Sequence, residues 1–133
     1  MRAQDPQGTK DITCPFDTEE PKAVFTISTS LPVAIRNRFM DVFMELGTRA
    51  KEKPATVSES YGHYREIVKV GLKGLVNTYG GKGNAITMNG HVTDEVLDSL
   101  SEIRLKTGFD NLVNWLGSEI WKANTLADEE KKS

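Results

Sequence analysis

Apolar and polar residues alternate along residues 25–31, and the period changes at Pro32. Phe25, Ile27 and Leu31 share one parity. Because successive strand residues point to opposite faces, this pattern predicts a half-buried strand. After Pro32 the apolar residues lie three or four positions apart, which is typical of a helix with one buried face. These residues are Ile35, Phe39, Val42, Phe43 and Leu46, and the following Gly47 is a helix stop signal.

A second helix is expected after the polar loop at residues 48–60. Its apolar positions again have helical spacing, and they are Tyr61, Tyr64, Val68, Leu72, Leu75 and Val76. The order of strand, helix and helix then recurs. An offset of 61 residues maps Phe25 onto Ile86 and Gly47 onto Gly108, and beyond that glycine the offset falls to 48. Two copies of one unit are therefore predicted.

A lone strand leaves its backbone groups unpaired on both edges, so the two predicted strands are expected to pair with each other. The predicted fold is mostly α-helical with a two-stranded antiparallel ribbon, a tandem ribbon-helix-helix that forms an intramolecular pseudodimer. The predicted organisation is a mobile arm (1–22), a first repeat (23–77), a linker (78–84), a second repeat (85–124) and a polar tail (125–133).

This order of elements resembles the ribbon-helix-helix superfamily of the Arc and MetJ repressors. The strands end in Leu31-Pro32 and Val92-Thr93, and each is followed by a helix that ends in glycine and by a second helix. The tandem form is similar to TraY and other accessory DNA-binding proteins of conjugation and T-DNA transfer. The resemblance implies that the ribbon enters the major groove of double-stranded DNA and that a helix N-terminus holds a phosphate. Because both strands lie in one chain at an offset of 61 residues, a monomeric pseudodimer is expected, and pairs of it can bind adjacent half-sites on DNA.

The outward parity of the two predicted strands would contact bases under this resemblance. The candidates are Thr26, Ser28, Ser30, Thr87, Asn89 and His91. Hydroxyls can donate or accept, and Asn can pair with adenine through two hydrogen bonds. Neither face contains Arg or Lys, which indicates weak readout or a leaning toward A·T pairs. The alternative is a solvated strand face, where Ser and Thr are common.

Charge favours the first repeat as the DNA anchor. Residues 23–80 carry eight bases and five acids, a net charge of +3, whereas residues 81–133 carry six bases and nine acids, a net charge of −3. The candidate phosphate contacts are Arg49, Lys51, Lys53 and Ser58, with a merely solvated loop as the alternative. Asp110 is expected to cap the second helix of the second copy, where its charge would repel a phosphate.

The composition narrows the function classes further. The net charge of −2 argues against DNA binding, because DNA-binding domains usually carry a basic surplus. Cys14 is the single cysteine, which predicts a reduced thiol, and neither His91 nor His63 has metal-ligand spacing with it. No membrane segment, signal peptide or catalytic constellation is visible, and GGKGN (80–84) lacks the ending of a phosphate-binding loop. A cytoplasmic protein that is not an enzyme and has no cofactor is expected.

Two function classes follow. The first is a sequence-specific DNA-binding protein, either an accessory factor of plasmid or T-DNA transfer or a transcriptional repressor, with other transfer or regulatory proteins as further partners. The second is a protein-interaction module with the same fold and little DNA binding, which the net charge and Asp110 favour. A steep salt dependence of duplex binding separates the two classes, because phosphate neutralisation produces that slope.

Overall fold

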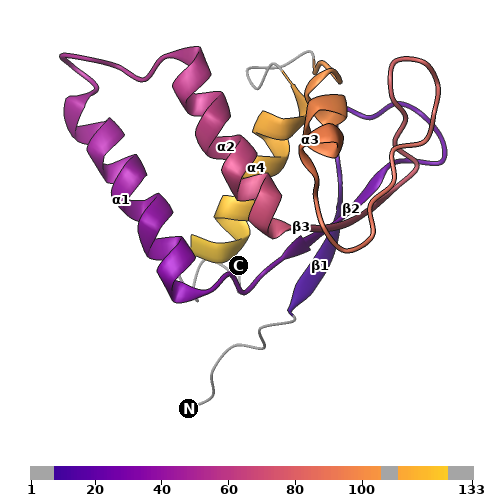
Figure 1. Ribbon diagram of the computed structural model, residues 1–133, viewed down its shortest axis with the longest axis horizontal. Coiled ribbons are helices and arrows are strands. Elements are labelled where there is room, and N and C mark those ends of the chain that lie inside the picture. The colour runs from indigo at the N-terminus through magenta and orange to yellow at the C-terminus, as the bar shows by residue number, and fades with distance from the viewer. Residues whose placement is uncertain (1–7, 106–110, 126–133) are drawn as a thin grey trace.

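The computed structural model describes residues 8–105 and 111–125. Within these residues the chain forms three strands and four helices (Figure 1). In chain order they are β1 (Thr9–Thr13), β2 (Val24–Ser28), α1 (Val33–Arg49), α2 (Val57–Gly71), β3 (Leu72–Val76), α3 (Asp94–Ser101) and α4 (Leu112–Thr125). The predicted Gly108 helix stop and Asp110 cap lie outside the described residues, as do most of the predicted tail and the start of the predicted arm.

The strands form one antiparallel sheet in the order β1-β2-β3, so the predicted two-stranded ribbon of a tandem ribbon-helix-helix is wrong. The strand that was expected to pair with residues 85–92 is instead the centre of the sheet. β1 and β3 together provide hydrogen-bond partners for both edges of β2. Because both edges are filled by neighbouring segments, β2 needs no second copy of the unit.

β1 comes from the segment that the sequence predicts as a mobile arm. Lys10 pairs with Ile27 and Asp11 pairs with Thr26, and the Thr26 hydroxyl donates to Asp11 Oδ1 at 2.7 Å. Ile12 packs against the core, whereas the other β1 side chains are exposed. Such polar edge strands are common because exposed charges protect an edge from further pairing.

β3 begins where α2 ends, inside the segment predicted as one continuous helix. Leu72, Leu75 and Val76 have helical spacing, but the backbone becomes extended at Leu72, the C-cap of α2. Hydrogen bonds to the edge of β2 outweigh the weak helical period here. The pairing also shifts register: Thr26 faces Gly74 while Ile27 faces Leu72, so Lys73 is the extra residue of a β-bulge.

Residues 85–92 are not a strand of the sheet. They begin with an isolated bridge between Tyr79 and Ala85, and the chain then follows an irregular path to α3. Ile86 and Val92 are buried, so the alternation marks burial correctly. Gly90 has a φ of +76°, a left-handed conformation that interrupts an extended strand.

The core lies between the sheet and helices α2 and α4. Phe25 of β2 meets Trp115 of α4 edge to face, with ring centroids 6.3 Å apart. Two glycines let α2 and α4 approach closely: a Cβ added at Gly71 would lie 2.5 Å from Ile120, and one at Gly117 would lie 2.7 Å from the Cβ of Tyr64. No helix of the described residues is both long and apolar enough to cross a membrane.

Asn124 joins the end of α4 to the chain that leaves β2. This side chain is only 3% exposed. Its Oδ1 accepts the backbone N–H of Leu31, and its Nδ2 donates to the carbonyl oxygens of Ser28 and Ile120, all at 2.8 Å. One amide thus satisfies three buried backbone groups and fixes the start of α1 relative to α4.

Candidate functional site

The three candidate base contacts of the first predicted strand lie in β2 or two residues after it, and of the three only Ser28 is buried. Thr26 is in the central strand and bonds to Asp11. Ser28 is 4% exposed, and its Oγ accepts the backbone N–H of Ser30 at 3.2 Å. The Oγ of Ser30 is buried and has no hydrogen-bond partner among the described residues. Because β2 is paired on both edges, these hydroxyls do not form the outer face of a two-stranded ribbon.

The other three candidates lie in the irregular segment before α3. Thr87, Asn89 and His91 are all exposed. Their alternation with buried Ile86 and Val92 is the pattern that the sequence revealed, but no strand pairing holds them in a common plane. They therefore do not extend the surface of β2.

The candidate phosphate contacts lie near the connection between α1 and α2. Lys51, Lys53 and Ser58 are exposed, whereas Arg49 forms an ion pair with Glu59 of α2. A capping box closes the N-terminus of α2: the Thr56 side chain accepts the N–H of Glu59, and the Glu59 side chain accepts the N–H of Thr56. The N–H groups of Thr56 and Glu59 are thus used within the chain.

A pocket of about 470 Å³ brings three of the predicted residues together. Ser28, Ser30 and His91 line it beside Lys69 of α2 and Lys73 of β3, and these five residues define the β3 pocket. Neither lysine was a predicted site residue, and both fall in a segment predicted as one helix. Lys69 and Lys73 lie near Ser30 because the chain turns from α2 into β3.

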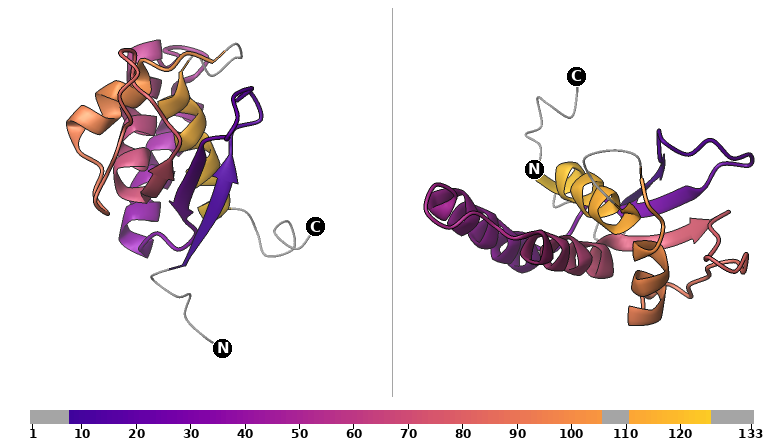
Figure 2. Two further views of the ribbon diagram at one scale, coloured as in Figure 1. Left: turned by 90° about the vertical axis from the view of Figure 1, so that its right-hand side faces the viewer. Right: turned by 90° about the horizontal axis from the view of Figure 1, so that it is seen from above.

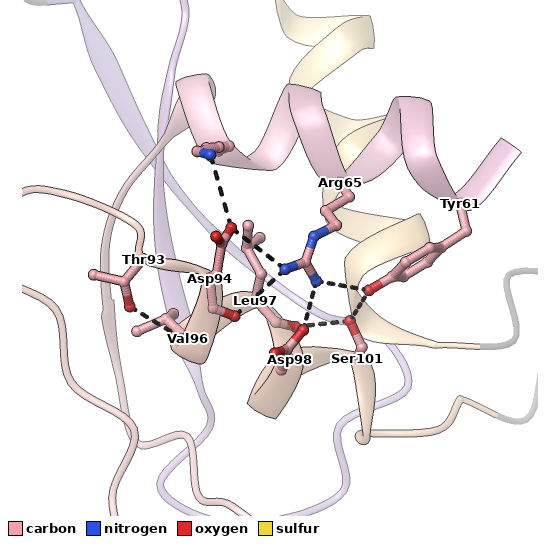
Figure 3. A network of polar contacts seen from close by, with 9 residues as sticks. Tyr61, Arg65, Thr93, Asp94, Val96, Leu97, Asp98 and Ser101 are labelled. Atoms are coloured by element: carbon pink, nitrogen blue, oxygen red, sulfur yellow. Dashed lines mark hydrogen bonds and ion pairs between the residues drawn. The ribbon is translucent and has the colours of Figure 1, made fainter. Parts of the chain in front are cut away.

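A polar network joins α2 to α3 (Figure 3). Nη1 of Arg65 donates to Tyr61 Oη and to Asp98 Oδ1, both at 2.9 Å, and Nη2 reaches Asp94 Oδ1 at 3.4 Å. Burial lowers the pKa of Arg65, but the bonds to Tyr61 and Asp98 outweigh this effect, so the pKa is raised. Arg65 is therefore a permanently charged tie between two helices.

Within the described residues, neither a metal site nor a reactive thiol stands out. No group of three or more His, Cys, Asp or Glu side chains in the described ranges could hold a metal ion. Cys14 lines a pocket of about 610 Å³ with Tyr79 and Leu112, and burial raises the pKa of its thiol. Because the thiolate is the nucleophile, a raised pKa makes Cys14 less reactive than a free cysteine.

Helix α1 carries an apolar surface that the described residues leave uncovered. Val33 is 59% exposed, Met40 is 43% exposed and Met44 is 65% exposed. The spacings of seven and four residues place the three side chains on one side of the helix. We call this set the α1 stripe. It lies apart from the face of α1 that packs on the core, which includes Phe39 and Phe43.

The core-facing side of α1 is held mainly by aromatic contacts. Phe39 and Phe43 meet Trp121 of α4 with ring centroids 6.2 Å and 5.2 Å apart, and Phe43 also approaches Tyr64 of α2 at 6.3 Å. Phe39 is the one buried residue of this helix. Figures 1 and 2 show α1 as the helix farthest from the sheet.

Comparisons of the chain with protein-family models, with curated proteins and with solved structures find no match.

The sequence already contained a signal for the α1 stripe, although these residues were not predicted as a site. Ile35, Phe39, Val42, Phe43 and Leu46 already fill one helical face, so Val33, Met40 and Met44 widen the apolar arc beyond what one packed face requires.

Proposed function

We propose that this protein is a protein-interaction module and that the α1 stripe binds an apolar groove of a partner protein. The observation that carries this proposal is the exposure of Val33, Met40 and Met44 on one side of a helix whose opposite side is already packed. Grouped apolar side chains on a surface mark interaction sites more often than single exposed ones do.

The shape of the stripe suits insertion into a groove on the partner protein. From Val33 to Met44 it covers 11 steps along the helix, or about 16 Å at roughly 1.5 Å per residue. An amphipathic helix that inserts a narrow apolar row into a groove is a recurrent recognition mode. Methionine suits such contacts because its unbranched, polarisable side chain adapts to irregular surfaces.

A capture experiment tests the proposal. The chain and its Met40→Gln/Met44→Gln variant are immobilised and exposed to an extract of the cells that naturally produce the protein, and the bound proteins are quantified by mass spectrometry. We expect a specific partner whose retention falls at least tenfold in the variant, which corresponds to about 1.4 kcal/mol. Glutamine is a good helix former, so α1 should remain folded.

The matched control is Asp41→Asn/Glu45→Gln, which changes two exposed positions of the same helix outside the stripe. It should retain the partner at the level of the unmodified chain. Sedimentation at several concentrations accompanies the capture, because a second copy of the chain could also cover the stripe. Equal retention of the partner by both double variants contradicts the proposal. The proposal is also contradicted if no sample captures a specific partner and sedimentation shows no dimer.

DNA binding remains a prediction and is the second candidate. The ribbon is absent, so base readout by Thr26, Ser28 and Asn89 is not proposed again in that form. Exposed Lys51 and Lys53 favour contacts to phosphates alone. Binding of random duplex that weakens steeply with salt, and that Lys51→Gln/Lys53→Gln flattens, would support this candidate. Binding that is undetectable at low salt would remove it.

A further inference from the structure

The β3 pocket has a chemical character distinct from that of the α1 stripe. We propose that it binds a small anion with a short apolar body, such as an alkyl carboxylate or an alkyl phosphate. This inference is independent of the proposed partner protein, because the pocket has its own residues. Four features of the pocket support it: the lysine charges, the β-bulge, the unpaired hydroxyl and the apolar lining.

The charged side chains that line the pocket are all basic. They are Lys69 and Lys73, and no Asp or Glu among the described residues lines the pocket; His91 adds an imidazole ring to the lining. Lys69 has a structural role as well, because it stands in the last turn of α2 and its Nζ lies 3.7 Å from Asp94 Oδ1. Lys73 and His91 have no partner within the described part of the chain. The charge of Lys73 and the ring nitrogens of His91 are therefore available to a ligand.

The β-bulge explains how Lys73 reaches the pocket. Successive residues of a regular strand point to opposite faces. Leu72 and Lys73 are successive in β3, yet both line this pocket. The register shift between β2 and β3 falls at Lys73 itself. Bulges redirect side chains in this way and occur often beside binding and active sites.

Ser30 supplies a hydrogen-bond donor that the protein leaves unused. Its Oγ is buried without a partner among the described residues, although Ser30 lines the pocket. Buried polar groups in native structures are nearly all hydrogen-bonded, and an oxygen atom of a bound ligand would give this hydroxyl a partner. The neighbouring Ser28 Oγ already accepts the N–H of Ser30, but its own proton remains free to donate. Both hydroxyls can donate to an oxyanion.

The rest of the lining is apolar and sets the second part of the ligand. Leu31, Ile35, Val70 and Val92 contribute to the wall. A volume of about 470 Å³ exceeds that of a single oxyanion and falls in the usual range for small-molecule sites, roughly 300–1,000 Å³. A ligand can use both kinds of lining if its charged head group lies beside Lys73 and Ser30 and its short alkyl chain lies against the apolar wall.

Three six-carbon probes test the inference: hexanoate, hexyl phosphate and 1-hexanol. Each is titrated into the full chain, and binding is followed by the amide NMR signals of Ser30, Lys73 and His91. Both anions should bind saturably, with 1-hexanol at least tenfold weaker. The stronger of the two anions shows whether the natural head group is a carboxylate or a phosphate. No saturable shift with either anion overturns the inference.

Two substitutions and one control locate the site. Lys73→Met keeps most of the side-chain stem and should weaken both anions about tenfold, because hydrogen bonds to charged groups are the stronger ones. Ser30→Ala should weaken them two- to tenfold. Lys10→Met, which changes an exposed lysine on the opposite edge strand, should have no effect. If 1-hexanol binds as tightly as hexanoate, or Lys73→Met binds like the unmodified chain, the site is not an anion pocket.

Discussion

Helices α1 and α4 have similar lengths but very different surroundings. α4 has 14 residues, of which seven are buried, whereas α1 has 17 residues, of which Phe39 alone is buried. α4 packs against α2 and the sheet, and Gly117 brings its backbone close to Tyr64. α1 instead meets the rest of the protein through bulky aromatic side chains along one edge.

This difference indicates that α4 contributes mainly to stability and that α1 is available for recognition. A residue packed on all sides contributes to the free energy of unfolding, because its apolar surface is removed from water. A helix held along one side can present its remaining surface at little cost in stability. Elements that bind partners are drawn from such weakly buried regions. Substitutions in the two helices test whether α4 stabilises the core while α1 is free to bind.

The largest expected contrast is between Leu116→Ala and Met44→Ala. Leu116 of α4 is fully buried, so its truncation removes apolar contacts and leaves a cavity, at a cost of about 2–5 kcal/mol. Met44 of α1 is 65% exposed, so the same change should shift stability by about 0.5 kcal/mol or less. Urea unfolding of both variants measures the two values.

Similar losses of stability in the two variants would contradict the difference between α4 and α1. In that case Met44 must be buried in solution, by a second copy of the chain or by a different position of α1. Repeating the unfolding at two protein concentrations separates these causes, since only self-association makes the apparent stability depend on concentration.

A smaller contrast is expected between two helical glycines. A Cβ at Gly117 would lie 2.9 Å from the backbone oxygen of Tyr64, so Gly117→Ala must move a helix and should destabilise the protein by about 1–3 kcal/mol. A Cβ at Gly47 would meet nothing within 4 Å, so Gly47→Ala should stabilise by roughly 0.5–1 kcal/mol through helix propensity. Thermal melts decide the sign of each change, and a stabilised Gly117→Ala would show that α2 and α4 are not tightly packed.

The helices were the part of the fold that the sequence predicted best. Periodic apolar residues indicated α1 and most of α2, because burial of one face repeats every three or four residues. The same rule failed at Leu72, where five residues are too few to separate a helical period from a strand. It also failed at Ile86, because alternation reports burial and does not reveal whether a hydrogen-bond partner is present.

The candidate sites depended on contacts that sequence spacing does not contain. The polar β1 gave no strand pattern, so the pairing that made β2 a central strand could not be predicted. Ser30, Lys73 and His91 are far apart in sequence and meet only after the chain turns at Gly71 and bulges at Lys73. The α1 stripe could have been predicted from the sequence, because the apolar residues of this helix cover a wider arc than one packed face requires.

The smallest expected effect concerns Glu59, which holds the C-terminal end of α1 to α2. The backbone N–H of Thr56 and the Arg49 guanidinium lower the pKa of Glu59 below its usual value of 4.5, and the former is the larger cause. A carboxyl with a lowered folded-state pKa stabilises the protein above its unfolded pKa, and that contribution is lost as the pH falls through the folded pKa. Stability from this contact should therefore decline as the pH falls below about 4.5.

Glu59→Gln isolates this contribution, because glutamine can still complete a capping box but cannot pair with Arg49 as a charge. The variant should melt slightly below the unmodified chain at pH 7, and the difference should shrink in acid, since protonated Glu59 is then also neutral. Arg49→Gln should give the same pH-dependent difference. Amide hydrogen exchange sharpens the test, because faster exchange should appear near Arg49 in α1 and not in α4. A melting difference that stays constant with pH would show that the capping bond alone matters and that the charge pair does not anchor α1.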